Sequence, residues 1–264
     1  MTNPHGNFIW YELMSPDPDA SKTFYEAVVG WDIEGAQSGD MDYRMITIPG
    51  EENAGGLLGL TAEMQANGAR PTWLGYVGVD DVDAMLGSIE HAGGRTLMPA
   101  RDIPGIGRFA MIADPQGAPL YIMKPIPPAG QEDADSTVFS VDKPMHVRWN
   151  ELTTSDPDAA ITFYKRHFGW HQEGEMDMGP MGKYRFLQHA GVAIGAVMPK
   201  PPQMPASLWS YYIGVDDIDR AIGAIEAGGG KVSNGPHEIP GGEYSLHAID
   251  PQQATFGLVG PRKA

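Results

Sequence analysis

The chain contains one pattern of residues twice, and this internal repeat constrains the fold more than any other feature. Residues 10–31 read WYELMSPDPDASKTFYEAVVGW and residues 149–170 read WNELTTSDPDAAITFYKRHFGW, with 12 of the 22 positions identical. Later in each copy, WLGYVGVDDVDAMLGSIE from Trp73 is matched by WSYYIGVDDIDRAIGAIE from Trp209. Self-similarity on this scale predicts two tandem domains, at 7–125 and 146–260. Between them, residues 126–145 are rich in proline, acidic and small residues, which is typical of a linker.

Within each copy, helix and strand signals alternate. Asp17-Pro18-Asp19 predicts a helix start, because aspartate caps free N–H groups and proline suits the first turn, and Gly30 predicts its end. A second helix starts at Asp80 or Asp81 and ends at Gly93-Gly94. Alternating or short apolar runs predict the strands, which we place at 9–14, 31–35, 43–48, 55–60, 73–79, 95–100, 109–113 and 119–124. Each half of a copy is therefore β-α-β-β-β, and the fold class is α+β.

Composition narrows the classes of partner. The 34 acidic residues against 18 basic ones give a formal charge of −16, which disfavours nucleic acid and anionic membranes as partners and leaves a small molecule. The absence of cysteine excludes disulfides, thiolate nucleophiles and cysteine-bound zinc. Neither a signal-peptide pattern nor an apolar run of about 20 residues is present, so we expect a cytoplasmic protein.

Three motifs resemble those of the vicinal-oxygen-chelate (glyoxalase/bleomycin-resistance/dioxygenase) superfamily. They are the Asp17…Phe24-Tyr25…Gly30-Trp31 segment, the run at 79–83, and the turn at 114–117, and copy two repeats all three. The resemblance covers nearly the whole chain outside the linker. It implies that two β-α-β-β-β modules in each domain form a curved, half-open barrel around a ligand cleft.

The resemblance also says where a divalent metal ion is held in related enzymes, by His or Glu side chains on three strands. Those positions correspond here to Trp10, Leu74 and Tyr121 in copy one and to Trp149, Ser210 and Gly257 in copy two. None of these side chains offers the imidazole nitrogen or carboxylate oxygen that such metals require. We therefore expect a family member without the metal ligands and without a cofactor.

Two glutamates are the candidate catalytic residues. Strand side chains alternate, so Glu12 points to the same face as Trp10, and Glu151 to the same face as Trp149. A carboxylate facing a cleft could act as a general base or accept a hydrogen bond from a ligand. A purely structural role in the scaffold, shared by both copies, is the alternative.

Aromatic and charged residues supply the candidate ligand-binding set, and for each of them core packing or a surface ion pair is the alternative. Flat apolar walls suit a planar ligand. In addition, Arg108 favours an anionic ligand in copy one, whereas copy two offers polar hydrogen-bonding groups. The set is Trp10, Trp73, Tyr76, Arg108, Tyr121, Trp149, Trp209, Tyr211, Tyr244 and His247.

Three functions fit this sequence. The first is metal-independent binding of a small molecule, of the sequestration or resistance type. The second is a lyase, isomerase or hydrolase that uses a cleft glutamate as general base. The third is a structural or regulatory tandem module. We also expect the two domains to pack against each other as a pseudo-dimer, because the linker is long enough to let them meet.

Overall fold

The computed structural model describes residues 3–36, 41–50, 53–127, 129–130 and 134–263. The chain divides into two compact units, each made of three segments. Unit 1 comprises Met1–Ile9, Gly75–Ser136 and Trp149–Trp209, and unit 2 comprises Trp10–Leu74, Thr137–Arg148 and Ser210–Ala264. Each unit therefore combines one half of copy one with the opposite half of copy two. Of the predicted linker 126–145, residues 128 and 131–133 lie outside the described residues.

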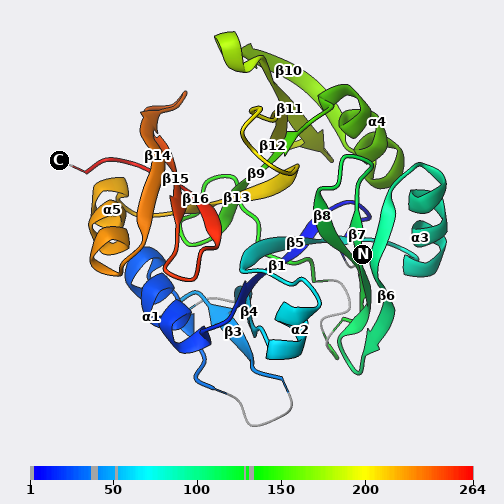
Figure 1. The fold of residues 1–264 in the computed structure, drawn as a ribbon, viewed down its shortest axis with the longest axis horizontal. Coiled ribbons are helices and arrows are strands. Elements are labelled where there is room, and N and C mark those ends of the chain that lie inside the picture. The colour runs from blue at the N-terminus through cyan, green and yellow to red at the C-terminus, as the bar shows by residue number, and fades with distance from the viewer. Residues whose placement is uncertain (1–2, 37–40, 51–52, 128, 131–133, 264) are drawn as a thin grey trace. The chain divides into compact units, whose positions relative to one another are not determined.

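The described residues of copy one form eight strands and three helices, and Figure 1 shows how most of them are arranged. In chain order they are β1 (Phe8–Ser15), α1 (Pro18–Val29), β2 (Asp32–Ile33), β3 (Tyr43–Thr47), β4 (Asn53–Gly59), α2 (Ala62–Ala66), β5 (Thr72–Gly78), α3 (Val82–His91), β6 (Arg95–Ile103), β7 (Gly107–Ala113) and β8 (Pro119–Pro125).

Within the described residues, copy two repeats this order with two differences: no helix stands between β12 and β13, where copy one has α2, and a short 3-10 helix stands between β10 and β11. Its elements are β9 (Val147–Thr154), α4 (Pro157–Phe168), β10 (His171–Asp177), η1 (Gly179–Met181), β11 (Lys183–His189), β12 (Val192–Pro199), β13 (Leu208–Gly214), α5 (Ile218–Ala227), β14 (Lys231–Glu238), β15 (Tyr244–Ile249) and β16 (Thr255–Gly260).

Each copy contributes one mixed sheet of eight strands. The orders are β2-β3-β4-β1-β5-β8-β7-β6 and β10-β11-β12-β9-β13-β16-β15-β14. In copy one, β1 pairs with β4 and β5 with β8 in parallel, whereas the pairs β2-β3, β3-β4, β6-β7 and β7-β8 are antiparallel. The two end strands of each order do not pair with each other in the described residues, so neither sheet closes into a barrel. The predicted α+β class and the tandem β-α-β-β-β organisation are confirmed.

The helix boundaries follow the predicted capping residues. The Asp17 carboxylate accepts a hydrogen bond from the Ala20 N–H at 3.0 Å, and α1 ends at Gly30 with φ 93°. Of the two candidates at the second helix, Asp81 is the cap, since its carboxylate accepts from the Ala84 N–H. The short helix α2 was not predicted; its only strong local signal is the Thr61 hydroxyl, which caps it.

Two of the sequence motifs join copy one to copy two inside the core of each unit. In unit 2 the buried Tyr25 hydroxyl donates to Asp250 Oδ2 at 3.1 Å, and in unit 1 the Tyr164 hydroxyl donates to Asp114 Oδ2 at 3.0 Å. Burial raises the pKa of both aspartates above the ordinary value. The Phe-Tyr pair of one copy thus binds the Asp-Pro turn of the other, which accounts for the joint occurrence of the two motifs.

In unit 2, helices α1 and α5 lie side by side (Figure 1). Among the helices of the described residues, none combines the length and apolar character that a membrane crossing requires.

Candidate functional site

A hydrogen-bonded array of tryptophan, tyrosine and glutamate joins strands β9 and β11 of copy two. The Trp149 indole N–H donates to the Tyr184 hydroxyl at 2.7 Å, and that hydroxyl donates to Glu151 Oε2 at 2.7 Å. Glu151 is 5% exposed, whereas both aromatic rings are half-buried. All three residues belong to unit 1. The tyrosine therefore fixes a buried carboxylate beside a partly exposed aromatic surface.

The same residue types recur in unit 2. The Trp10 indole N–H donates to the Tyr43 hydroxyl at 2.8 Å, and Glu12, two residues further along β1, is 3% exposed. Glu12 stands in register with Gly56 of β4, and Gly56 with Met45 of β3. A side chain at Gly56 would overlap the Tyr43 hydroxyl, so glycine is what allows the phenol to cross β4 toward Trp10.

Ion pairs anchor the strands that carry the two tyrosines. The buried Arg44 guanidinium, next to Tyr43, contacts Asp42 and Asp19 at 2.7 Å each. Its counterpart Arg185, next to Tyr184, pairs with Asp158. Asp19 and Asp158 lie in the first turns of α1 and α4. These ion pairs therefore tie each strand to a helix and thereby position the tyrosines.

Neither tyrosine was proposed from the sequence, although a signal exists. Tyr43-Arg44 and Tyr184-Arg185 are the same dipeptide in both copies, at an offset of 141 residues. The match is easily missed because the offset between the two copies is 139 residues near the first helix and 141 residues here. An insertion in the intervening loop produces this change.

Each unit also carries a second aromatic group, contributed by the other copy. In unit 1, the Tyr76 and Tyr121 rings stack with centroids 4.2 Å apart. In unit 2, the Tyr212 hydroxyl is hydrogen-bonded to Nε2 of His247. Gly257 makes this possible, because a Cβ there would come within 2.5 Å of the Tyr212 ring. Unit 1 thus has two stacked tyrosine rings where unit 2 has a hydrogen-bonded tyrosine–histidine pair.

Glu12 and Tyr212 each follow a tyrosine that contacts a tyrosine of the other copy within unit 2. Tyr11 of β1 meets Tyr211 of β13 edge to face, with centroids 5.2 Å apart. Because successive side chains on a strand point to opposite faces, the next residue on each strand, Glu12 or Tyr212, projects away from this contact. The carboxylate from copy one and the tyrosine–histidine pair from copy two belong to the same unit.

Several other candidate residues lie on the opposite, helix-facing side. The Trp73 indole donates to the Tyr25 hydroxyl at 2.9 Å, and the Trp209 indole to the Tyr164 hydroxyl at 3.0 Å, both within the core. Tyr211 is also fully buried. We therefore leave these three out of the proposed site.

Two polar candidates form surface contacts instead. Arg108 pairs with Asp83 at 2.8 Å and with Asp102 at 3.0 Å, and both carboxylates hold its pKa above the ordinary value. The Tyr244 ring lies under the Arg262 guanidinium, 4.3 Å from its centroid. Both belong to the same helix-facing side of their strands, so the structure does not bring them to the glutamates.

The side chains at the positions used by related metal enzymes do not fit a metal ion. Leu74 and Tyr121 are buried apolar or aromatic residues, and Trp10 and Trp149 donate their indole N–H groups to tyrosines. Within the described ranges, no group of three or more His, Cys, Asp or Glu side chains has a geometry that could hold a metal ion. The donor chemistry of these positions therefore disagrees with the metal sites expected from the resemblance.

Comparison with known proteins gives a consistent assignment. Residues 7–121 and 144–258 each match the model of the Glyoxalase/Bleomycin resistance protein/Dioxygenase superfamily. The chain is 32% identical over 255 residues to CFP32 of Mycobacterium tuberculosis, a glyoxylase by its name, with 96% of this chain and 94% of the relative covered. It is 29% identical over 283 residues to the anthracycline biosynthesis protein DnrV of Streptomyces peucetius, covering 95% and 91%.

A solved structure shares the fold at low sequence identity. The Mn(II)-bound glyoxalase from Novosphingobium aromaticivorans superposes with a TM-score of 0.65 at 17% identity, covering 98% of this chain and 83% of that one. Two family-model matches spanning most of the sequence, on two sheets of the same topology, show that the chain belongs to the Glyoxalase/Bleomycin resistance protein/Dioxygenase superfamily.

Proposed function

We propose that the protein binds a small planar organic molecule, independently of a metal ion, against the tryptophan–tyrosine–glutamate arrays. The observation that carries this proposal is the array itself, in which Tyr184 holds the buried Glu151 carboxylate at 2.7 Å beside the half-buried Trp149 ring. An aromatic surface suits a planar ring, and a fixed carboxylate suits an O–H or N–H donor on that ring. The ligand class is therefore a planar ring system that carries at least one hydrogen-bond donor.

The surrounding aromatic residues support the same ligand class. Phe186 packs against both Trp149 and Tyr184, with centroids 6.2 and 5.9 Å away. Tyr76 and Tyr121 add a second stacked pair to unit 1. One relative takes part by its name in anthracycline biosynthesis, and anthracyclines are planar polycyclic molecules that bear hydroxyl groups.

The test uses two probes that differ in a single donor. 1-Naphthol has the ring and one O–H group, whereas naphthalene has the ring alone. We expect 1-naphthol to bind the wild-type protein more tightly, and Glu151→Gln to weaken that binding by about 1–3 kcal/mol while leaving naphthalene binding unchanged. Equal affinity for the two probes, or loss of thermal stability in Glu151→Gln without any change in binding, would assign the glutamate to the scaffold instead.

A second candidate function is catalysis with Glu12 as general base. It is favoured by the Tyr212–His247 pair, which supplies a hydrogen-bonded hydroxyl and imidazole in the same unit as Glu12. Native mass spectrometry of protein purified from its own cells would identify a bound molecule. Unchanged ligand after incubation supports binding, and turnover that Glu12→Gln abolishes supports the enzyme.

We further propose that the two domains, at 7–125 and 146–260, pack as a pseudo-dimer within one chain. The support is that each compact unit draws one module from each copy. Solution scattering from a single compact particle is the expected result, and scattering from two independently moving bodies would contradict it.

A further inference from the structure

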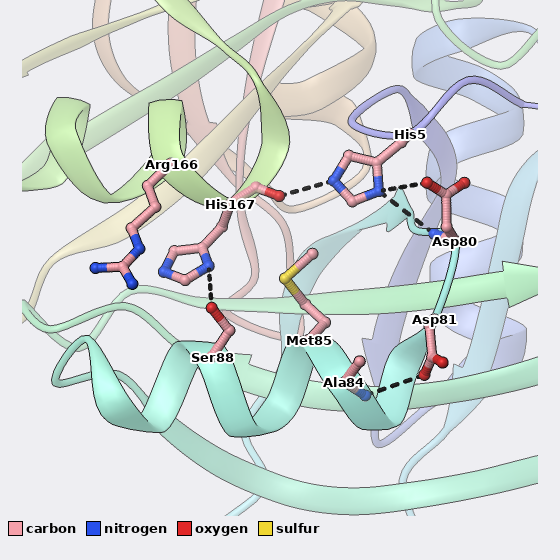
Figure 2. A pocket seen from close by; sticks show the side chains of 8 residues that line it. All are labelled: His5, Asp80, Asp81, Ala84, Met85, Ser88, Arg166 and His167. Atoms are coloured by element: carbon pink, nitrogen blue, oxygen red, sulfur yellow. Dashed lines mark hydrogen bonds and ion pairs between the residues drawn. The ribbon is translucent and has the colours of Figure 1, made fainter.

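Unit 1 contains a pocket between helices α3 and α4, and none of the array residues described above lines it. Its volume is about 310 Å³. Asp80, Asp81 and the first turns of α3 form one side, Arg166 and His167 at the end of α4 form another, and His5 lies across the top (Figure 2).

Unit 2 shows which group fills the corresponding place there. Arg220 of α5 donates to the carbonyl oxygens of Ala27 and Val28 at the end of α1, at 3.1 and 3.0 Å. Its Nε donates to the Asp216 carboxylate at 2.8 Å. The guanidinium thus joins α5 to the last turn of α1, the end of a helix where a cation is stabilised by the helix dipole.

The repeat offsets identify the equivalent residues in unit 1. Subtracting 136 converts Arg220 to Ala84 and Asp216 to Asp80, and adding 139 converts Ala27 and Val28 to Arg166 and His167. All of these unit 1 residues line the pocket. The acceptors for a guanidinium are therefore retained, whereas the side chain that carries it is reduced to a methyl group.

His5 takes over part of the missing contact. Its Nε2 is 2.8 Å from the His167 carbonyl oxygen, which can only accept, so Nε2 carries the proton. Its Nδ1 then accepts from the Asp80 N–H at 3.3 Å and lies 3.6 Å from the Asp80 carboxylate. Because His5 and Ala84 both line the pocket, neither fills the space between them.

One polar group in this pocket has unused hydrogen-bonding capacity. His167 is 3% exposed, and its Nε2 has no hydrogen-bond partner within the described chain. The equivalent residue in unit 2 is Val28, so an apolar side chain is compatible with this position. Burial and the neighbouring Arg166 hold the pKa of His167 below its ordinary value, which keeps the ring neutral. An unpartnered buried nitrogen is destabilising, and a ligand would satisfy it.

Opposite charges stand at the two ends of the pocket. Figure 2 shows the Arg166 guanidinium at the His167 end, with Asp80 and Asp81 at the other and Met85 between them. No acidic side chain of the described ranges pairs with Arg166, although six of the other arginines have such partners, namely Arg44, Arg108, Arg148, Arg185, Arg220 and Arg262.

We propose that this pocket binds a small zwitterion, with a guanidinium or ammonium group between Asp80 and the end of α4 and a carboxylate at Arg166. The cationic end takes the role that Arg220 has in unit 2. The carboxylate neutralises Arg166, and the charge of −16 on the chain favours the approach of the cationic end. Free arginine is one molecule of this class.

The experiment titrates wild-type protein with L-arginine, methylguanidinium and acetate, monitored by NMR. We expect saturable binding of arginine, binding of methylguanidinium at least about tenfold weaker because the carboxylate contact is missing, and no binding of acetate. Arg166→Ala should reduce arginine to the affinity of methylguanidinium. Asp80→Asn should weaken both cations at least about tenfold.

Two variants test the equivalence of the units. Ala84→Arg supplies the missing side chain and should abolish arginine binding while leaving 1-naphthol binding unchanged, which separates this pocket from the proposed function. Arg220→Ala should open the matching place in unit 2 and add a second methylguanidinium site. Absence of saturable arginine binding to the wild type would overturn the proposal, and so would binding that Ala84→Arg and Asp80→Asn both leave intact.

Discussion

Replacing Tyr184 with phenylalanine tests whether the array is held together as the structure indicates. The change removes one oxygen and leaves the ring, so packing against Phe186 is retained. Two hydrogen bonds are lost, from the Trp149 indole at 2.7 Å and to Glu151 Oε2 at 2.7 Å. A hydrogen bond to a charged group contributes about 1.5–3 kcal/mol, and one between neutral groups about 1 kcal/mol.

The expected loss is smaller than the sum of these values. Trp149 is half-buried, so water can replace the phenol as acceptor for its indole N–H. We therefore expect Tyr184→Phe to lower the free energy of unfolding by about 2–3 kcal/mol. Urea denaturation followed by tryptophan fluorescence measures this change, and 1-naphthol titration measures the accompanying loss of affinity.

A double-mutant cycle with Glu151→Gln isolates the tyrosine–glutamate bond from the other effects. The coupling energy should be about 1–3 kcal/mol, as for groups in direct contact. Strictly additive effects of the two substitutions on stability would show that the hydrogen bond contributes nothing, and would refute the positioning role assigned to Tyr184. Tyr43→Phe in unit 2 provides the matched variant for the Trp10 contact.

Three further predictions concern single positions and metal content. Gly257→Ala should disrupt the Tyr212–His247 pair, because the new Cβ would lie 2.5 Å from the Tyr212 ring. We expect urea denaturation to show a loss of about 1–3 kcal/mol in the free energy of unfolding. Unchanged stability would mean that the ring moves freely. His167→Val, which installs the residue found at the equivalent position in unit 2, should stabilise the protein and flatten its acid sensitivity. Since burial lowers the pKa of folded His167, the unfolded chain takes up a proton first, and stability is lost as pH falls through the ordinary histidine range near 6.5; identical pH–stability curves for variant and wild type would contradict this. Elemental analysis after mild purification should find well under one transition metal ion per chain, and chelator treatment should leave the thermal midpoint unchanged, whereas a stoichiometric ion would show that other side chains provide ligands.

Part of the candidate site could be predicted from sequence because strand geometry is strictly alternating. The placement of Glu12 with Trp10, and of Glu151 with Trp149, needs only the two-residue period of a strand. The positions of Trp73 and Trp209 could not be predicted in this way. An aromatic residue on a strand suits the core face and the ligand face equally well, so its residue type does not say which face it occupies. Their contacts with Tyr25 and Tyr164 place them in the core.

By itself, the sequence determined the features that depend on neighbouring residues. The caps at Asp17 and Asp81 define helix starts because a carboxylate reaches N–H groups only three residues away, and the repeat specifies two sheets of one topology. Only the tertiary structure decided which module of one copy packs against which module of the other. Each module has two partners of nearly identical pattern, one in its own copy and one in the other, and local signals cannot choose between them. The choice is made by long-range contacts such as those of Tyr25 with Asp250 and Tyr164 with Asp114, which bury polar groups that must find a specific partner. It is this pairing that brings Tyr212 and His247 of copy two into the same unit as Glu12 of copy one.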